Sequence, residues 1–130
     1  MTWTKKTAAA ASALLVAVGG MLVTASPAAA ALSCPVNRLC IYDRASFGGE
    51  RIASASTNAC FTMEEFKTFE HIVSYRNNLS VNAIVWHVDF NSWGYVKART
   101  LVAGGFSSDI GDDGLGAMSM DKVCMGNASP

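Results

Sequence analysis

Four cysteines constrain the fold of this chain more than any other feature of its sequence. Cys34, Cys40, Cys60 and Cys124 all lie after residue 30. An even number of cysteines in a small exported domain is typical of disulfides, which add stability that a small core lacks. Three pairings are open. We favour Cys34–Cys40, closed by the turn-forming residues 35–37, together with Cys60–Cys124, and we therefore expect two disulfides.

The first thirty residues have the layout of a secretory signal peptide. Lys5 and Lys6 precede an apolar run over residues 7–23, and residues 26–30 end it with small side chains. A basic start, an apolar stretch and a small-residue exit are what signal peptidase requires. We predict cleavage after Ala30, which leaves a single domain over residues 31–130 and a secreted, extracellular protein. A transmembrane anchor is the alternative, and residues 31–34 only loosely resemble a lipoprotein box.

The charge of the predicted mature domain excludes some classes of partner. The signal holds two of the ten Lys and Arg residues and none of the ten Asp and Glu residues, so the mature domain carries a net charge of −2. Nucleic-acid binding needs a concentrated positive face that displaces counterions. We therefore expect no nucleic-acid partner and no membrane partner after the signal is removed. Separately, we expect the protein to be a monomer.

Short segments of β type fill the mature domain. They are residues 38–42, 50–54, 72–75, 83–88, 95–102 and 118–124, and Gly, Asn and Asp punctuate them. One helical turn is predicted over residues 62–66, because Thr62 and Glu65 have capping-box spacing. No segment keeps a helical period long enough for a core helix. The order strand, glycine turn, strand, polar loop, strand occurs twice at about forty residues per copy, which predicts an all-β sandwich of two Greek-key units.

The first of these units carries a recognisable signature. Tyr42, Phe47 and Gly49 follow the pattern aromatic, four residues, aromatic, one residue, Gly. This pattern resembles the βγ-crystallin Greek key, in which the first aromatic packs against a folded hairpin and the Gly adopts a conformation that a Cβ would obstruct. Together with residues 34–42, it resembles the start of the secreted peptidase inhibitor family I36. The resemblance implies a βγ-crystallin-like fold for the whole mature domain.

The second unit departs from the signature. Counting back from Gly94 places Ser92 and His87 where aromatic residues are expected. Trp86 and Trp93 each lie one residue away from those positions. The register of the second hairpin is therefore open.

The resemblance also raises calcium as a ligand, because some βγ-crystallin domains bind it at two Asn/Asp residues followed by Ser/Thr residues. Residues 69–74 keep one acid and the final Ser74, whereas residues 112–117 keep both acids, Asp112 and Asp113, and lose both hydroxyls. Calcium needs six to eight oxygen ligands. Asp112 and Asp113 are the better calcium candidates, and an acidic surface turn is the alternative. No other cofactor is expected.

The family likeness implies a secreted inhibitor of extracellular metallo- or serine proteases. Such an inhibitor offers a rigid loop that loses little entropy on binding. Residues 53–58, anchored by Cys60, and residues 103–109 are the candidate loops, and ordinary mobile loops are the alternative. The preferred inhibitory residues are Ser54, Ala55, Ser56, Thr57 and Asn58.

Other functions remain open at this stage. One alternative is a non-inhibitory binding or structural module, either calcium-stabilised or calcium-free, and another is a toxin-like secreted protein. An enzyme is not supported, because no G-x-S-x-G or metalloprotease motif occurs, and His87 is interpreted as a packed or surface strand residue. Four aromatic residues, Trp86, Phe90, Trp93 and Tyr95, could alternatively form a carbohydrate-stacking patch or pack the core and the hairpin.

Overall fold

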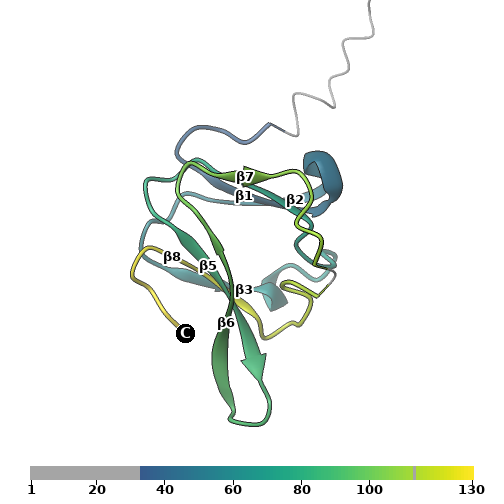
Figure 1. Cartoon of the computed structure of the whole chain (residues 1–130), viewed down its shortest axis with the longest axis vertical. Helices are drawn as coiled ribbons and strands as arrows, with labels where there is room; N and C mark the ends of the chain where they lie inside the picture. Colours follow the sequence, from purple (N-terminus) through teal and green to yellow (C-terminus); the bar gives the residue numbers. More distant parts are fainter. Residues whose placement is uncertain (1–32, 113) are drawn as a thin grey trace, which may run out of the picture. The chain divides into compact units, whose positions relative to one another are not determined.

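A computed structural model of the chain describes residues 33–112 and 114–130 (Figure 1). The predicted signal peptide over residues 1–30 and the calcium candidate Asp113 lie outside the described residues. Within the described ranges, no helix is long and apolar enough to cross a membrane.

Two successive groups of four strands make up the domain. The first group is β1 (Leu39–Arg44), β2 (Gly48–Ser54), β3 (Cys60–Thr62) and β4 (Ser74–Asn77), with 3-10 turns η3 (Ala45–Phe47) and η4 (Met63–Glu65). The second group is β5 (Ala83–Asp89), β6 (Gly94–Leu101), β7 (Phe106–Ser107) and β8 (Lys122–Met125).

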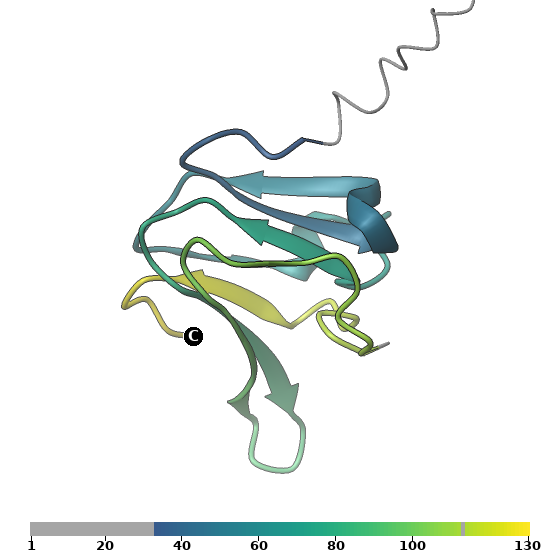
Figure 2. The ribbon, with the colours of Figure 1, turned by 45° about the horizontal axis from the view of Figure 1, so that its top comes forward.

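The strands form two four-stranded antiparallel sheets, ordered β2-β1-β4-β7 and β3-β8-β5-β6 (Figures 1 and 2). Each group keeps its first, second and fourth strands together and sends its third strand to the other sheet. β3 of the first group pairs with β8, and β7 of the second group pairs with β4. This arrangement confirms the predicted all-β sandwich of two Greek-key units.

The core lies between the inner faces of the two sheets. Alternation along the strands turns every second side chain inward, so that Leu39, Ile41, Ile52 and Tyr75 of the first sheet are buried with Val85 and Val123 of the second. Burying such a side chain stabilises the fold by about 1.5–3 kcal/mol. The remaining members of the same cluster are Met63, Phe69, Ile72, Leu79, Ala83, Leu101, Leu115 and Met125.

The local predictions from sequence were correct for most elements and wrong for two strands. The predicted helical turn is present as η4, and its capping box joins Thr62 and Glu65. Strands β3 and β7 were not predicted, and both are very short. Residues 72–73 precede β4 because their amides bond to Leu115 and Tyr42 of other segments, and residues 118–121 form turns before β8.

The first hairpin folds back onto its own sheet. Tyr42 is buried, and the Phe47 ring meets it edge to face at 5.7 Å between centroids. Ser46 and Phe47 have positive φ values of 57° and 60°. Two hydrogen bonds hold this conformation, from the Ser46 amide to the Ser108 carbonyl and from the Phe47 amide to the Ser74 hydroxyl.

Both disulfides favoured from sequence are present. Cys34 is bonded to Cys40 across 6 residues, and Cys60 is bonded to Cys124 across 64 residues. Cys60 and Cys124 lie directly opposite each other on β3 and β8. The second bond therefore ties the first Greek-key unit to the sheet of the second unit.

Gly49 provides the first test of the fold. Gly49 and Gly104 share a φ of +74°, but a Cβ at Gly49 would overlap the Asp43 carboxylate, whereas a Cβ at Gly104 would have no atom within 4 Å. We expect Gly104→Ala to lower the free energy of unfolding by about 1–2 kcal/mol, the cost of the left-handed conformation alone. Gly49→Ala should lower it further in urea unfolding, and equal losses would contradict the close packing at Gly49.

The two disulfides provide a second test. Loop-closure entropy in the unfolded chain grows with the number of residues enclosed. Replacing Cys60 and Cys124 with Ala should therefore cost about 4 kcal/mol, and replacing Cys34 and Cys40 should cost about 2 kcal/mol. Urea unfolding of the two double variants measures both values. The reverse order would show that the long-range bond does not stabilise the sandwich by constraining the unfolded chain.

Candidate functional site

The loop between β2 and β3 is fixed to the end of β8. The Cys60–Cys124 disulfide closes its C-terminal end, and the Met125 amide donates a hydrogen bond to the Ala59 carbonyl at 2.9 Å. Gly126 lies so close to the Thr57 carbonyl that a Cβ would overlap it. A disulfide, a hydrogen bond and a close backbone approach therefore hold this loop.

Short-range hydrogen bonds order the same loop from within. The Ser54 hydroxyl accepts the Ser56 amide at 3.2 Å, and the Ser56 hydroxyl accepts the Asn58 amide at 3.4 Å. The side chains of Ala55, Thr57 and Asn58 are exposed. Residues 54–58 thus present exposed side chains on a backbone with defined turns, which is the arrangement required of a rigid binding loop.

The other loop considered from sequence, residues 103–109, is partly a strand. Phe106 and Ser107 pair with β4 as β7, and the Gly105 and Ser108 carbonyls accept the amides of Asn77 and Ser46. Much of its backbone is therefore already bonded within the domain. Within this segment, residues 106–107 form a sheet edge and residues 103–104 form a turn before it.

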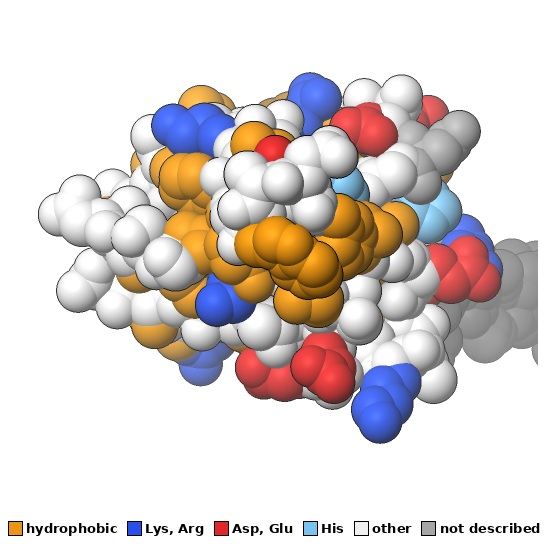
Figure 3. Space-filling view, turned by 90° about the horizontal axis from the view of Figure 1, so that it is seen from below, with side chains coloured by type: hydrophobic (Ala, Val, Ile, Leu, Met, Phe, Trp, Pro, Cys, Tyr) orange, Lys and Arg blue, Asp and Glu red, His pale blue; other side chains and the backbone are white. Residues whose placement is uncertain are grey.

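A third exposed element is the turn of the β5–β6 hairpin, which projects from the body of the sandwich (Figures 1 and 2). Phe90 and Trp93 meet edge to face at its tip, with ring centroids 6.0 Å apart, and Trp93 is 78% exposed. Seen from this end, hydrophobic side chains gather on the surface (Figure 3). The tip is the second surface on this domain that has the character of a contact site.

Asp89 organises that turn. Its carboxylate accepts the Asn91 amide at 3.0 Å and the Ser92 hydroxyl at 2.7 Å. The hydrogen bond from the Ser92 hydroxyl is the main reason that the pKa of Asp89 is below its ordinary value, and the Asn91 amide adds to it. Asp89 is therefore ionised at neutral pH and holds the turn in one conformation.

The four aromatic residues considered as a carbohydrate surface do not form one patch. Phe90 and Trp93 are at the tip, but Lys97 covers the Trp86 ring at 5.9 Å and Lys122 covers the Tyr95 ring at 5.1 Å. Trp86 and Tyr95 belong to the packing of the hairpin and its neighbours.

His87 has a buried partner that sequence reasoning did not identify. Its Nδ1 lies 3.1 Å from the carboxylate of Asp121, which is fully buried. The same carboxylate accepts the amides of Val88 at 3.1 Å and Met118 at 3.3 Å. These bonds join β5 to the turn before β8, and they assign His87 and Asp121 a role in packing.

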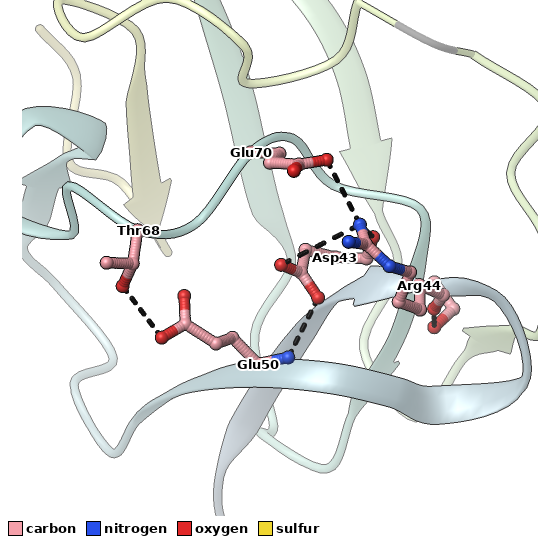
Figure 4. A network of polar contacts seen from close by, with 6 residues as sticks. Asp43, Arg44, Glu50, Thr68 and Glu70 are labelled. Atoms are coloured by element: carbon pink, nitrogen blue, oxygen red, sulfur yellow. Dashed lines mark hydrogen bonds and ion pairs between the residues drawn. The ribbon is translucent and has the colours of Figure 1, made fainter.

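The first calcium candidate, residues 69–74, is occupied by protein groups. The Arg44 guanidinium donates to the Glu70 carboxylate at 3.1 Å, and Thr68 donates to Glu50 at 2.7 Å (Figure 4). The Ser74 hydroxyl donates to the Arg44 carbonyl at 2.7 Å. The Arg44 guanidinium is therefore already paired with the Glu70 carboxylate, which a bound cation would need as a ligand.

The second calcium candidate is an exposed turn in the part that the structure describes. The Asp112 carboxylate accepts the Gly114 amide at 3.0 Å, as expected for an acidic surface turn. Across residues 33–112 and 114–130, no three His, Cys, Asp or Glu residues are grouped so that they could hold a metal ion.

The family model described as peptidase inhibitor family I36 matches residues 27–92. A solved double mutant of a βγ-crystallin domain from Clostridium beijerinckii is similar in structure at 16% identity and a TM-score of 0.46, covering 67% of this chain and 96% of that chain. No curated protein matches the chain.

The Asp89 turn gives a test by titration. We expect an NMR titration of the Asp89 carboxyl to give a midpoint below the ordinary value, because the Ser92 hydroxyl stabilises the charged form. Ser92→Ala should move that midpoint upward, whereas Ser80→Ala, at an exposed residue of the β4–β5 connection, should not. The turn is then stabilised above the ordinary pKa and loosens as the pH falls through the lowered value. An unchanged midpoint in Ser92→Ala would contradict this assignment.

Proposed function

Because the chain belongs to peptidase inhibitor family I36, we propose that it is a secreted inhibitor of extracellular metallo- or serine proteases that acts through residues 54–58. Membership of this family supports a peptidase-binding role and not an enzymatic one. The basic and apolar N-terminus and the two disulfides support the proposal that the protein is exported.

The observation that carries the proposal is the fixation of the loop over residues 54–58. A flexible segment loses conformational entropy when it enters an active-site cleft, at about 1–2 kcal/mol per residue of backbone. A loop that the fold already holds avoids most of that loss. It also resists the movement that a protease needs to complete cleavage, because Cys60 and Ala59 stay bonded to β8.

The projecting hairpin is the competing contact element. Ala83 pairs with Met125 at the end of β5 near the fixed loop, and Asp89 ends β5 at the hairpin turn. At about 3.3 Å per residue, the two elements lie about 20 Å apart along the sheet. One active-site cleft therefore takes either the loop or the tip, so variants of each separate the two.

The proposal is tested with the processed protein purified from the medium. We expect stoichiometric inhibition of a thermolysin-like metalloprotease or a subtilisin-like serine protease. Thr57→Arg should raise the inhibition constant at least about tenfold, or 1.4 kcal/mol, because a bulky charged side chain would occupy the centre of the contact. Ala98→Arg on exposed β6 serves as the matched control, and Trp93→Ala serves as the hairpin variant.

The possible outcomes test the proposed inhibition separately from the assignment of residues 54–58 as the inhibitory loop. Loss of inhibition in Trp93→Ala with full inhibition in Thr57→Arg would overturn the assignment of residues 54–58 and transfer the contact to the hairpin. No inhibition of either class by the folded protein at micromolar concentration would reject inhibition of these proteases and favour a binding or structural module.

A further inference from the structure

The outer face of the first sheet carries an arginine held by two aromatic rings. Arg76 lies directly opposite Phe106 on β7 and opposite Cys40 on β1. Its guanidinium carbon is 5.1 Å from the Phe47 ring centroid and 4.9 Å from the Phe106 ring centroid. The centroids of the two rings are 6.4 Å apart and the ring planes are tilted by 57° to each other, so the rings form a corner that the guanidinium contacts.

Two features fix the position of this guanidinium. The first is a cation–π contact with each of the two rings, which attracts the guanidinium to the ring faces. The Phe47 ring is itself fixed, because hydrogen bonds at Ser46 and Phe47 hold the left-handed backbone of η3. Arg76 is therefore ordered before any ligand arrives, so binding to it loses little side-chain entropy.

The donors of Arg76 are unused within the described residues. Arg44 donates to Glu70, and Arg51 donates to the Ser33 carbonyl, but no hydrogen bond or ion pair joins the Arg76 guanidinium to residues 33–112 or 114–130. A guanidinium presents five N–H donors in a planar fork that matches a carboxylate. An ordered guanidinium with free donors on a protein surface has the properties of an anion-binding group.

The neighbouring residues add positive charge and an apolar surface. Burial raises the pKa of Tyr42, whereas the positive charges of Arg51 and Arg76 both act in the opposite direction, so both guanidinium groups lie near this phenol. Phe106 is 62% exposed beside Arg76. A ligand therefore meets positive charge and an exposed aromatic ring together.

We propose that Arg76 and Phe106 form a binding site for a carboxylate that is attached to an apolar group. The carboxylate accepts two hydrogen bonds from the Arg76 fork, and the apolar group packs on the Phe106 ring. A peptide can supply this chemistry either from its C-terminal carboxylate after an apolar residue or from an Asp or Glu side chain beside one. The site uses neither residues 54–58 nor the hairpin tip, so it stands independently of the proposed inhibition.

The test is an NMR titration of the processed, folded protein with small probes. N-acetylphenylalanine should shift the Arg76 side-chain Nε–H signal and the Phe106 and Ser107 amides, and N-acetylphenylalaninamide, which lacks only the charge, should not. N-acetylglycine should bind more weakly because it lacks the ring. N-acetylaspartylphenylalaninamide supplies a side-chain carboxylate, so its affinity relative to N-acetylphenylalanine identifies which peptide source the site prefers.

Variants make the assignment specific. Arg76→Gln should weaken binding of N-acetylphenylalanine at least about tenfold, because a charged hydrogen-bond pair is lost. Phe106→Ala should weaken it several-fold, and an otherwise unchanged spectrum shows that each variant is folded. Equal shifts with the acid and its amide, undiminished binding by folded Arg76→Gln, or tighter binding of inorganic phosphate than of the acid would each overturn the proposal.

Discussion

The exchange of third strands between the two Greek-key units is the constraint on which the rest of the structure depends. β3 completes the second sheet, and β7 completes the first. Neither strand is long enough to be stable as an isolated pairing. Each is held because the two inner faces bury one shared core between them. The Cys60–Cys124 disulfide makes the first of these exchanges covalent.

The exchange explains why the loop over residues 54–58 is fixed. The loop leaves β2 in the first sheet and enters β3 in the second sheet, so its two ends are anchored in different layers of the sandwich. Movement of the loop would require movement of β3 against β8, which the disulfide and the Met125–Ala59 hydrogen bond oppose. A loop between neighbouring strands of one sheet lacks this two-layer support, and the projecting β5–β6 turn relies instead on its own Asp89.

Sequence patterns predicted the parts of the fold that depend on neighbouring residues. The signature at Tyr42, Phe47 and Gly49 indicated the folded hairpin, and the β-type segment over residues 83–88 indicated the strand that became β5. The two strands that were missed pair only with residues far away in the chain, and each has too few residues to alternate. Their position depends on the long-range topology and not on local propensity.

The candidate site was predictable to a similar degree. Cys60 marked an anchored loop from its position alone, but Ala59 and Gly126 became part of the site only through contacts with the far end of the chain. His87 was correctly expected to be a strand residue, whereas its partner Asp121 lies 34 residues away and has no sequence signal of its own. The acids Glu70 and Asp112 suggested calcium from sequence. In the structure, the Glu70 carboxylate accepts a hydrogen bond from Arg44, and the Asp112 carboxylate accepts one from the Gly114 amide.

The central claim is that the strand exchange holds residues 54–58 rigid before any protease binds. Backbone ¹⁵N relaxation of the processed protein measures this directly at Ala55, Thr57 and Asn58. The account predicts order parameters of about 0.85, equal to those of the sheet strands. Values below about 0.6, with the strands still rigid, would contradict it.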